Sequence, residues 1–495
     1  MLFTHLLIDD IFVRFSKKQE YPQKRCDHIR YFRIICAEIT IIQWNMLIRF
    51  NVANFLSFKN DTEFNMLAAK ALKTHKEHVY SLNRGLKILK ASAIYGANGA
   101  GKSNLIKAIN SFKEIVEQGF IPKKVNEKKN KLAKEGLNQP ITHEIEFSIK
   151  NRIYTYGIVF DSNLCIEEWL YQTGVETSKM IFERTYSDKK QHPVLKMQES
   201  FLKTEKNRLL ISLMEENLLQ NNELLISKRE NLKIKEINDV YNWFNENLII
   251  IYPETKSTSI FSDTYSDNSF KDFAEKLLHG FDVGINNLSL KSDASEDLKY
   301  LLKSVGISFN EARIEKMKKE VDEGHIGLIE GEQYTISITK ENEKYIIRRV
   351  VTTHRVNGND VAFEIKEESD GTQRLFDFIP MIRSVLDKET TYLVDEIDRS
   401  LHPALLHSLI KKIMDNDSTL GQLIFTTHES SLLSCKIFRA DEIWFAEKDK
   451  EDQCTHLYTL NEFKPRNDLD IEKGYLNGRF GAIPFLSRLD DLNWN

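Results

Sequence analysis

The residues best suited to chemistry form a glycine-rich segment that ends in a lysine and a serine. Residues 96–103 read Gly-Ala-Asn-Gly-Ala-Gly-Lys-Ser, which fits the pattern G-x-x-x-x-G-K-[ST]. Glycines let successive backbone N–H groups converge on phosphate oxygens, and a following helix adds its positive end. Lys102 supplies a mobile charge for β- and γ-phosphates, and the Ser103 hydroxyl suits Mg²⁺, which prefers oxygen ligands. The segment therefore predicts a phosphate cradle for ATP and Mg²⁺. The expected nucleotide contacts are Gly96, Asn98, Gly99, Gly101, Lys102, Ser103 and Asn104.

Two carboxylates follow an apolar strand far along the chain. Tyr392-Leu393-Val394 precedes Asp395 and Glu396, and Asp395 comes 395 − 102 = 293 residues after Lys102. Asp395 could hold the magnesium shell, and Glu396 could polarise the attacking water as a general base. By itself, an apolar run before Asp-Glu is more often a buried strand that meets a charged loop. The assignment therefore depends on the residues around it.

The neighbours of this pair favour a phosphate site. Asp398 follows closely, and Pro403 suits the first turn of an amphipathic helix expected over 405–414. A second apolar strand, expected over 423–427, is followed by His428. A lone histidine is often only structural, but a neutral imidazole at the carboxyl end of a parallel strand is well placed to contact a γ-phosphate.

A further polar segment lies upstream, at 368–374, and reads Glu-Ser-Asp-Gly-Thr-Gln-Arg before an apolar stripe typical of a helix. This order places Ser369 and Gly371 at a helix N-terminus, where an anion is favoured. The alternative is that Ser369 or Asp370 only caps the helix. The segment alone does not decide between these two interpretations.

Composition indicates an ordinary globular protein. The chain has 495 residues, of which 41% are hydrophobic and 29% charged, and its net charge is −4, so charge gives no general argument for nucleic-acid binding. The five cysteines are scattered without a C-x-x-C pair, which indicates neither a cysteine zinc site nor a disulfide framework and favours a reducing cytoplasm. No apolar run approaches the ~18–20 residues of a membrane span, so no membrane association is expected.

The elements that must position these residues divide the chain into four parts. Residues 1–45 are interpreted as an extension, with a possible start at Met46. Residues 46–160 would form the first half of the core, with the phosphate loop and an antiparallel lobe over 144–160. Residues 161–330 are expected to be a mainly helical lid, without the heptads of a coiled-coil arm. Residues 331–490 would form the second half.

Taken in order, these motifs resemble the ABC-type ATPase heads of the SMC, RecF and overcoming-lysogenization-defect groups. The resemblance implies an α/β P-loop NTPase of the ABC/SMC head type, with an antiparallel β lobe and a mainly helical insertion. It also implies ATP hydrolysis by a homodimer or higher homo-oligomer, in which the 369–371 segment of one subunit closes on the nucleotide held by Lys102 of the other. Two departures stand out. Thr372 replaces the usual second glycine, and the usual glutamine after the first half is not identified in the sequence, with His143 as the candidate for its position.

More narrowly, three segments look like the AAA-family ATP-binding proteins of bacterial abortive-infection and phage-defence operons, of the RloA and AbiL types. These are Asn54-Phe55-Leu56-Ser57-Phe58, residues 368–372 and the tail 474–484. The resemblance implies an ATPase subunit that controls a nuclease or toxin partner. The alternative is a RecF/SMC-like ATPase that clamps DNA. After His428 the sequence has no Asp-x-Asp at an expected strand end, and Asp468-Leu469-Asp470 lies in a polar loop, so we expect nuclease activity to belong to the partner. The tail fits a partner-binding role or simple packing on the core equally well.

Overall fold

The computed structural model describes residues 44–483 except 83–84, 133–135, 175–176, 258–263, 265–266, 325–326, 332–333 and 467–468. Internal contacts divide the chain into two units, Met1–Gln43 and Trp44–Asn495. The expected extension, 1–45, thus falls almost wholly outside the described residues. The second unit contains all the predicted site residues.

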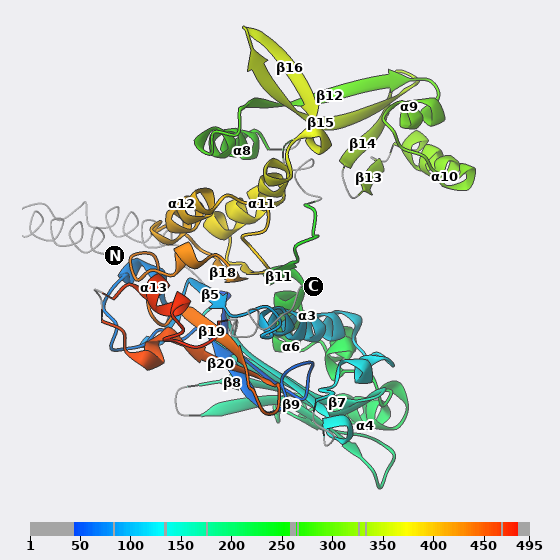
Figure 1. The fold of residues 1–495 in the computed structure, drawn as a ribbon. Coiled ribbons are helices and arrows are strands. Elements are labelled where there is room, and N and C mark those ends of the chain that lie inside the picture. The colour runs from blue at the N-terminus through cyan, green and yellow to red at the C-terminus, as the bar shows by residue number, and fades with distance from the viewer. Residues whose placement is uncertain are drawn as a thin grey trace, which may run out of the picture. The chain divides into compact units, whose positions relative to one another are not determined.

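A six-stranded sheet carries the predicted motifs (Figure 1). Its order is β11-β17-β18-β5-β19-β20, and all neighbours are parallel except β19 and β20. The strands expected before the phosphate loop and before the two carboxylates are therefore both present, with one strand between them. The strands are β5 (Ala91–Tyr95), β11 (Leu248–Ile251), β17 (Thr391–Val394), β18 (Gln422–Thr426), β19 (Ile443–Lys448) and β20 (Thr455–Thr459).

Both faces of this sheet are buried, as parallel sheets require. On one face, α3 (Lys102–Gln118) packs its apolar stripe against Ile94 and Leu393. On the other face, the helices pack against Tyr392 and Phe425. Successive residues of β17 thus point into different cores, as the two-residue period of a strand predicts. The helices of the second face are α11 (Asp370–Asp387), α12 (Pro403–Met414) and α13 (Ile471–Leu476).

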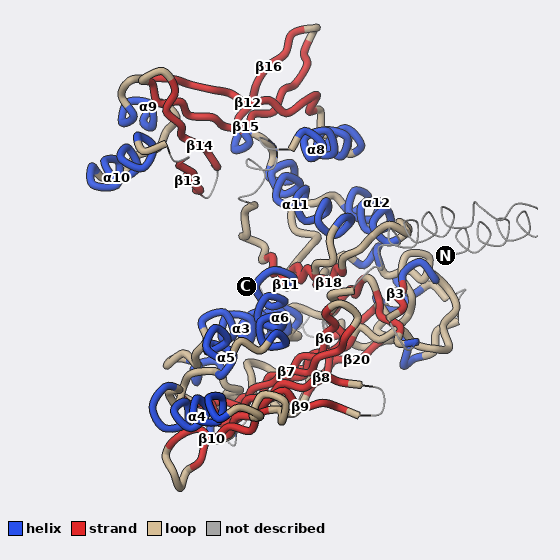
Figure 2. Tube along the Cα trace, turned by 180° about the vertical axis from the view of Figure 1, so that it is seen from behind, coloured by secondary structure: helices blue, strands red, loops and turns tan. Residues whose placement is uncertain are grey.

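The antiparallel lobe is a seven-stranded sheet whose strands run side by side in both views (Figures 1 and 2). The hairpin predicted within 144–160 is confirmed, because Ile149 pairs with Arg152 across its turn. The lobe shares its core with α3, where the Phe112 ring stacks on the Tyr156 ring at 5.5 Å between centroids. Its strands, in sheet order, are β10 (His192–Met197), β9 (Ser178–Ser187), β8 (Leu164–Thr173), β7 (Arg152–Asp161), β6 (Ile141–Ile149), β1 (Leu47–Ala53) and β2 (Thr62–Asn65).

A third, five-stranded sheet has its own small core with helices α9 (Leu298–Ser304) and α10 (Glu311–Asp322). Asn357 and Gly358 form the predicted hairpin turn between β15 and β16, with φ of 51° and 83°. The strands of this third sheet are β12 (Ile285–Ser295), β13 (Gly327–Gly331), β14 (Tyr334–Glu341), β15 (Lys344–Val356) and β16 (Asn359–Glu364). A separate hairpin pairs β3 (Val79–Ser81) with β4 (Lys87–Leu89).

The segment 161–330, expected to be a mainly helical insertion, contains the strands β8 to β13 as well as helices. Strands β8 to β10 extend the lobe, β11 joins the parallel sheet, and β12 and β13 belong to the third sheet. β8 to β10 pair with their neighbours in sequence, whereas β11 and β12 pair with remote strands, so the segment is distributed among three sheets. Its helices are α4 (Glu205–Leu213), α5 (Arg229–Leu232), α6 (Lys235–Asn242), α8 (Asn268–Gly280), α9 (Leu298–Ser304) and α10 (Glu311–Asp322), with shorter turns η5 (Met214–Leu218), η6 (Leu225–Lys228) and η7 (Trp243–Asn247).

Short helical turns also occur outside that segment, namely η1 (Lys76–His78), η3 (Val125–Lys128), η4 (Gly136–Asn138), η8 (Ile365–Glu367), η9 (Ser430–Leu432) and η10 (Leu460–Phe463). Among the described helices, none has both the length and the apolar character that crossing a membrane would need.

Candidate nucleotide site

The predicted phosphate loop joins the carboxyl end of β5 to the first residue of α3. Two of its glycines are required by close packing. A Cβ on Gly96 would lie 2.4 Å from the Ala446 carbonyl oxygen, and one on Gly101 would lie 2.1 Å from Thr455 Oγ1. Asn98 and Gly99 are exposed at the tip of the loop. The backbone therefore has the glycine-dependent course that a phosphate cradle needs.

The loop is supported by segments from both ends of the described chain. Ser57 Oγ accepts hydrogen bonds from Asn104 Nδ2 at 2.8 Å and from Thr455 Oγ1 at 2.7 Å. Thr455 Oγ1 also lies 2.8 Å from the Ala100 carbonyl oxygen. The Asn-Phe-Leu-Ser-Phe motif thus supplies a serine beneath the loop, and the Asn104 amide is engaged in this support. Sequence reasoning did not identify Thr455, which lies at the start of the last strand of the sheet.

Residues from two distant parts of the sequence meet beside the loop. Ser103 Oγ donates to Asp395 Oδ1 at 3.0 Å, and Thr426 Oγ1 donates to the same oxygen at 2.6 Å. The Asp395 side chain is buried. A hydroxyl and a carboxylate oxygen are both hard ligands of the kind that Mg²⁺ prefers. The two residues expected to share a magnesium ion are therefore adjacent.

Lys102 lies within the loop, and its Nζ donates to the Gly96 carbonyl at 2.8 Å. Burial lowers the pKa of this amine to about 8, although the charges of Asp395, Asp398 and Glu396 oppose the shift. The amine is thus near three carboxylates but bonded to backbone. A bound triphosphate would offer charged oxygens to the amine in place of those backbone carbonyls. Contact with the phosphate oxygens is the expected role of this lysine.

Glu396 and His428 follow the carboxyl ends of neighbouring strands β17 and β18. The Glu396 backbone is left-handed, with φ of 50°, and its N–H donates to Thr426 Oγ1 at 2.8 Å. The His428 backbone N–H donates to Asp398 Oδ1 at 3.3 Å. Burial, followed by the charge of Lys102, lowers the pKa of the His428 ring, which favours the neutral imidazole. Thr426, which holds both Asp395 and Glu396, was missed by sequence reasoning.

The 369–371 segment begins helix α11, as predicted. Ser369 Oγ accepts from the Thr372 backbone N–H at 3.2 Å and lies 2.9 Å from Thr372 Oγ1, so Ser369 is a helix cap in this chain. A Cβ on Gly371 would lie 2.8 Å from the Ser400 carbonyl oxygen, so the segment packs closely on the loop after Asp398. The two share a surface hollow of about 540 Å³, which is lined by Pro253, Glu254, Lys256, Asp370, Gln373, Arg374, Arg399 and Ser400.

The suggestion that His143 replaces the missing glutamine is wrong. Its ring is fully buried, neither nitrogen has a hydrogen-bond partner, and it packs on Phe55 at 5.0 Å and Phe160 at 5.4 Å between centroids. Burial lowers its pKa to about 3, so it is a neutral core residue. The turn after β11 is instead next to the site, because Asp395 N donates to the Ile251 carbonyl at 2.8 Å.

The tail contributes to packing over its described part. Tyr458 Oη donates to the Phe480 carbonyl at 2.8 Å, and Phe480 stacks on Phe445 at 6.0 Å between centroids. Asp470 caps α13. Asp468, half of the acidic pair considered for metal, and residues from 484 onward lie outside the described residues.

A comparison of the sequence with models of known protein families identifies the family of this chain. The model of a family described as "AAA domain, putative AbiEii toxin, Type IV TA system" matches residues 91–434, more than half of the chain. The chain belongs to this AAA-domain family. The match runs from β5, which leads into the phosphate loop, past His428, so it contains the candidate site. No curated protein matches the chain.

Several solved structures are similar to the chain at low identity. They include the SMC head bound to the "C-winged helix domain of ScpA" (13% identity, TM-score 0.36, 85% of this chain and 99% of that chain). The SMC head domain from Thermotoga maritima has 10% identity and a TM-score of 0.36 over 83% of this chain and 98% of that one. The Pyrococcus furiosus Smc head with an extended coiled coil has 13% identity and a TM-score of 0.35 over 85% of this chain and all of that one.

Proposed function

We propose that this chain binds ATP with Mg²⁺ and hydrolyses it. The observation that carries the proposal is the contact of Ser103 with Asp395 beside the phosphate loop. In this mechanism Lys102 neutralises the β- and γ-phosphates, and Ser103 and Asp395 hold the metal. Glu396 polarises the attacking water, and His428 contacts the γ-phosphate as a neutral donor. The metal supplies charge neutralisation at the phosphates.

The chain would act as an ATP-switched homodimer. Ser369 and Asp370 are exposed, and the segment faces a hollow whose lining includes the loop after Asp398 but no residue of the phosphate loop. A segment suited to an anion is thus open to a second molecule. In the proposed closed state it contacts the nucleotide held by Lys102 of the other subunit. ATP then favours one of two states by its differential affinity.

We further propose that this switch controls a nuclease or toxin partner in a bacterial defence system, in the cytoplasm. The proposal is supported by the family description, which names a toxin of a toxin–antitoxin system. The chain's own chemistry is that of nucleotide binding, so the toxic activity is assigned to a partner. The ATP-bound dimer would hold the partner in one state, and hydrolysis would release it.

The test measures nucleotide binding, hydrolysis and association together. The purified chain should hydrolyse ATP, and a hydrolysis-deficient Glu396→Gln variant should form a dimer with ATP by light scattering. Co-expression with the product of the neighbouring gene should give a complex that depends on nucleotide. A chain that binds no ATP would refute the enzymatic proposal. Salt-dependent DNA binding by the ATP dimer, without a protein partner, would favour the DNA clamp instead.

A further inference from the structure

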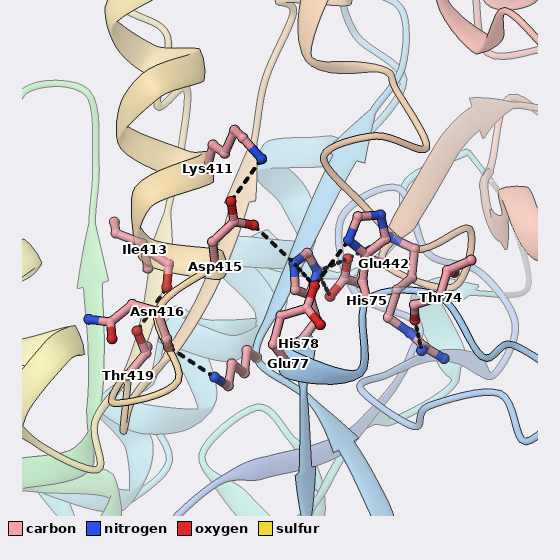
Figure 3. A network of polar contacts seen from close by, with 12 residues as sticks. Thr74, His75, Glu77, His78, Lys411, Ile413, Asp415, Asn416, Thr419 and Glu442 are labelled. Atoms are coloured by element: carbon pink, nitrogen blue, oxygen red, sulfur yellow. Dashed lines mark hydrogen bonds and ion pairs between the residues drawn. The ribbon is translucent and has the colours of Figure 1, made fainter.

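A second cluster of polar and ionisable side chains is drawn in Figure 3. It lies where the strands β5, β18 and β19 begin, away from the strand ends that precede the phosphate loop and Asp395. His75, Glu77 and His78 come from η1 and the residue before it. Asp415, which caps the end of α12, and Glu442, just before β19, come from elsewhere in the chain. Because the phosphate loop and Asp395 follow the other ends of strands, the cluster is separate from the nucleotide site.

The tautomer of His78 is set by a buried carboxylate. His78 Nδ1 lies 3.0 and 3.1 Å from the two oxygens of Glu442, and both side chains are fully buried. Glu442 also accepts the Arg439 backbone N–H at 2.7 Å, so it acts here as an acceptor. Since Nδ1 then carries the proton, Nε2 has a free lone pair, and this buried atom has no hydrogen-bond partner.

His75 has the opposite tautomer, for a similar reason. Its Nε2 lies 2.9 Å from the Cys435 carbonyl oxygen, and a carbonyl can only accept, so Nε2 carries the proton. Its Nδ1 lone pair then faces Glu77 Oε1 at 3.3 Å. The two rings are stacked, with centroids 4.7 Å apart, so charging both by protonation would place two cations face to face.

Acceptor atoms of His75, Glu77 and His78 therefore lie close together, and Asp415 approaches them on the His78 side. His78 Nε2 faces Glu77 Oε1 at 3.8 Å and Asp415 Oδ1 at 3.9 Å, in addition to the contact of His75 with Glu77. The ligand atoms of His75, Glu77 and His78 all lie within 4.8 Å of one another. Lone pairs and carboxylates at these distances repel each other unless a cation lies between them. Two nearby lysines are bonded elsewhere. Lys411 Nζ donates to the other Asp415 oxygen at 2.7 Å, and Lys90 Nζ donates to the Asn416 carbonyl at 3.2 Å.

We propose that His75 Nδ1, Glu77, His78 Nε2 and Asp415 bind one Zn²⁺ ion. Two imidazoles and two carboxylates are suitable zinc ligands. Tetrahedral zinc with bonds of about 2.0–2.1 Å separates its ligand atoms by about 3.3 Å. The observed spacings of 3.3, 3.8 and 3.9 Å are equal to or longer than this, so the ligands would move closer together on binding. The contacts of Glu442 with His78 and of the Cys435 carbonyl with His75 are those that orient metal-binding histidines. The ion would fasten η1 to the end of α12, the helix that follows the Asp398 loop.

The experiment measures metal content and stability of the full chain. Purified protein, stripped with a chelator and dialysed against Zn²⁺ in excess Mg²⁺, should retain one zinc per chain with submicromolar affinity and melt at a higher temperature than the stripped form. His75→Gln and Glu77→Gln should each lower the affinity at least tenfold. These partly exposed side chains can be replaced without opening the core, and unchanged circular dichroism would check folding.

His456→Gln, which changes an exposed histidine of β20, is the matched control and should keep the zinc. Substitution of Co²⁺ for Zn²⁺ should give the intense visible absorption of a four-coordinate site in the wild type and lose it in Glu77→Gln. Absence of bound zinc in the wild type, or full zinc content in both His75→Gln and Glu77→Gln, would overturn the proposal.

Discussion

The Ser103 hydroxyl donates to the Asp395 carboxylate at 3.0 Å, although 292 residues separate them in the sequence. The contact forms because α3 begins where β5 ends, while Asp395 follows β17, and only β18 lies between these two strands. Thr426, the last residue of β18, bridges the gap. The parallel register thus brings two separate motifs to one edge of the sheet, as expected for ligand sites in α/β folds.

Replacing Lys102 by alanine should abolish ATP binding. The amine is buried among Asp395, Glu396 and Asp398, and its removal leaves those carboxylates to repel a triphosphate. Fluorescent-nucleotide titration measures the effect. Lys107→Ala, on an exposed position of the same helix, is the control and should bind normally. Wild-type ATP affinity in Lys102→Ala would show that Lys102 does not contribute to nucleotide binding.

Glu396→Gln should retain ATP binding and slow hydrolysis by about a hundredfold or more, the scale of lost general-base assistance. The amide keeps the shape of the side chain but cannot take a proton from water. Phosphate release and light scattering with ATP should show slow turnover and a persistent dimer. Glu451→Gln, at an exposed position, should behave as wild type. Normal turnover in Glu396→Gln would show that another residue activates the attacking water.

Thr426→Val should weaken magnesium-dependent ATP hydrolysis although the residue need not contact nucleotide. Its hydroxyl donates to Asp395 and accepts from the Glu396 backbone. Losing it leaves buried groups unpaired, at a cost of about 1–3 kcal/mol. Thr426→Ser keeps the hydroxyl and should restore activity. Equal activity of the valine and serine variants would show that the bridge does not position the carboxylates.

ATP affinity should fall as the pH rises above about 8. Burial sets the pKa of Lys102 near 8 in the free protein, and a bound triphosphate would raise it, so binding above that pH must take up a proton. The loss approaches tenfold per pH unit until the raised pKa of the complex is reached. Calorimetry in buffers of different ionisation enthalpy measures the proton uptake. Constant affinity from about pH 7 to 9.5 would contradict the low pKa.

The two residues that precede Met46 should contribute to stability. The Trp44 ring lies 4.2 Å from the Tyr80 ring, and its backbone N–H donates to Asn151 Oδ1 at 3.1 Å. Deleting residues 1–45 should therefore lower the melting temperature relative to deleting 1–43, because an aromatic pair adds about 0.5–1.5 kcal/mol. We expect both deletions to keep ATPase activity. Identical melting curves would show that Trp44 adds nothing.

Local patterns predicted the phosphate loop, α3, the 144–160 hairpin and the strands before Asp395 and His428. In these segments, glycine spacing, apolar periodicity and turn residues all act over a few neighbouring positions. The strands within 161–330 were not predicted. β11 and β12 pair with β17 and β15, which are remote in sequence, and periodicity does not reveal such partners. β8 to β10 form successive local hairpins, whose alternation was not recognised. His143 was misplaced for a related reason: its alternating strand was recognised, but not that its ring faces the aromatic core.

Supporting residues were the hardest to predict. Thr426 ends an ordinary apolar strand, and Thr455 begins a short one, so neither has a sequence signal of its own. The zinc cluster combines a short His-x-Glu-His stretch with Asp415 and Glu442, and only the fold brings these together. Cysteine spacing, the usual sequence guide to zinc, does not detect such a site.

The dependence of the phosphate loop on Thr455 has a consequence for biosynthesis. Gly101 and Ala100 rest against a side chain that is translated more than three hundred residues after them. Since chains emerge from the ribosome amino end first, a nascent molecule has the complete glycine motif long before it has this support. Nucleotide capture is thus expected only once residue 455 has emerged.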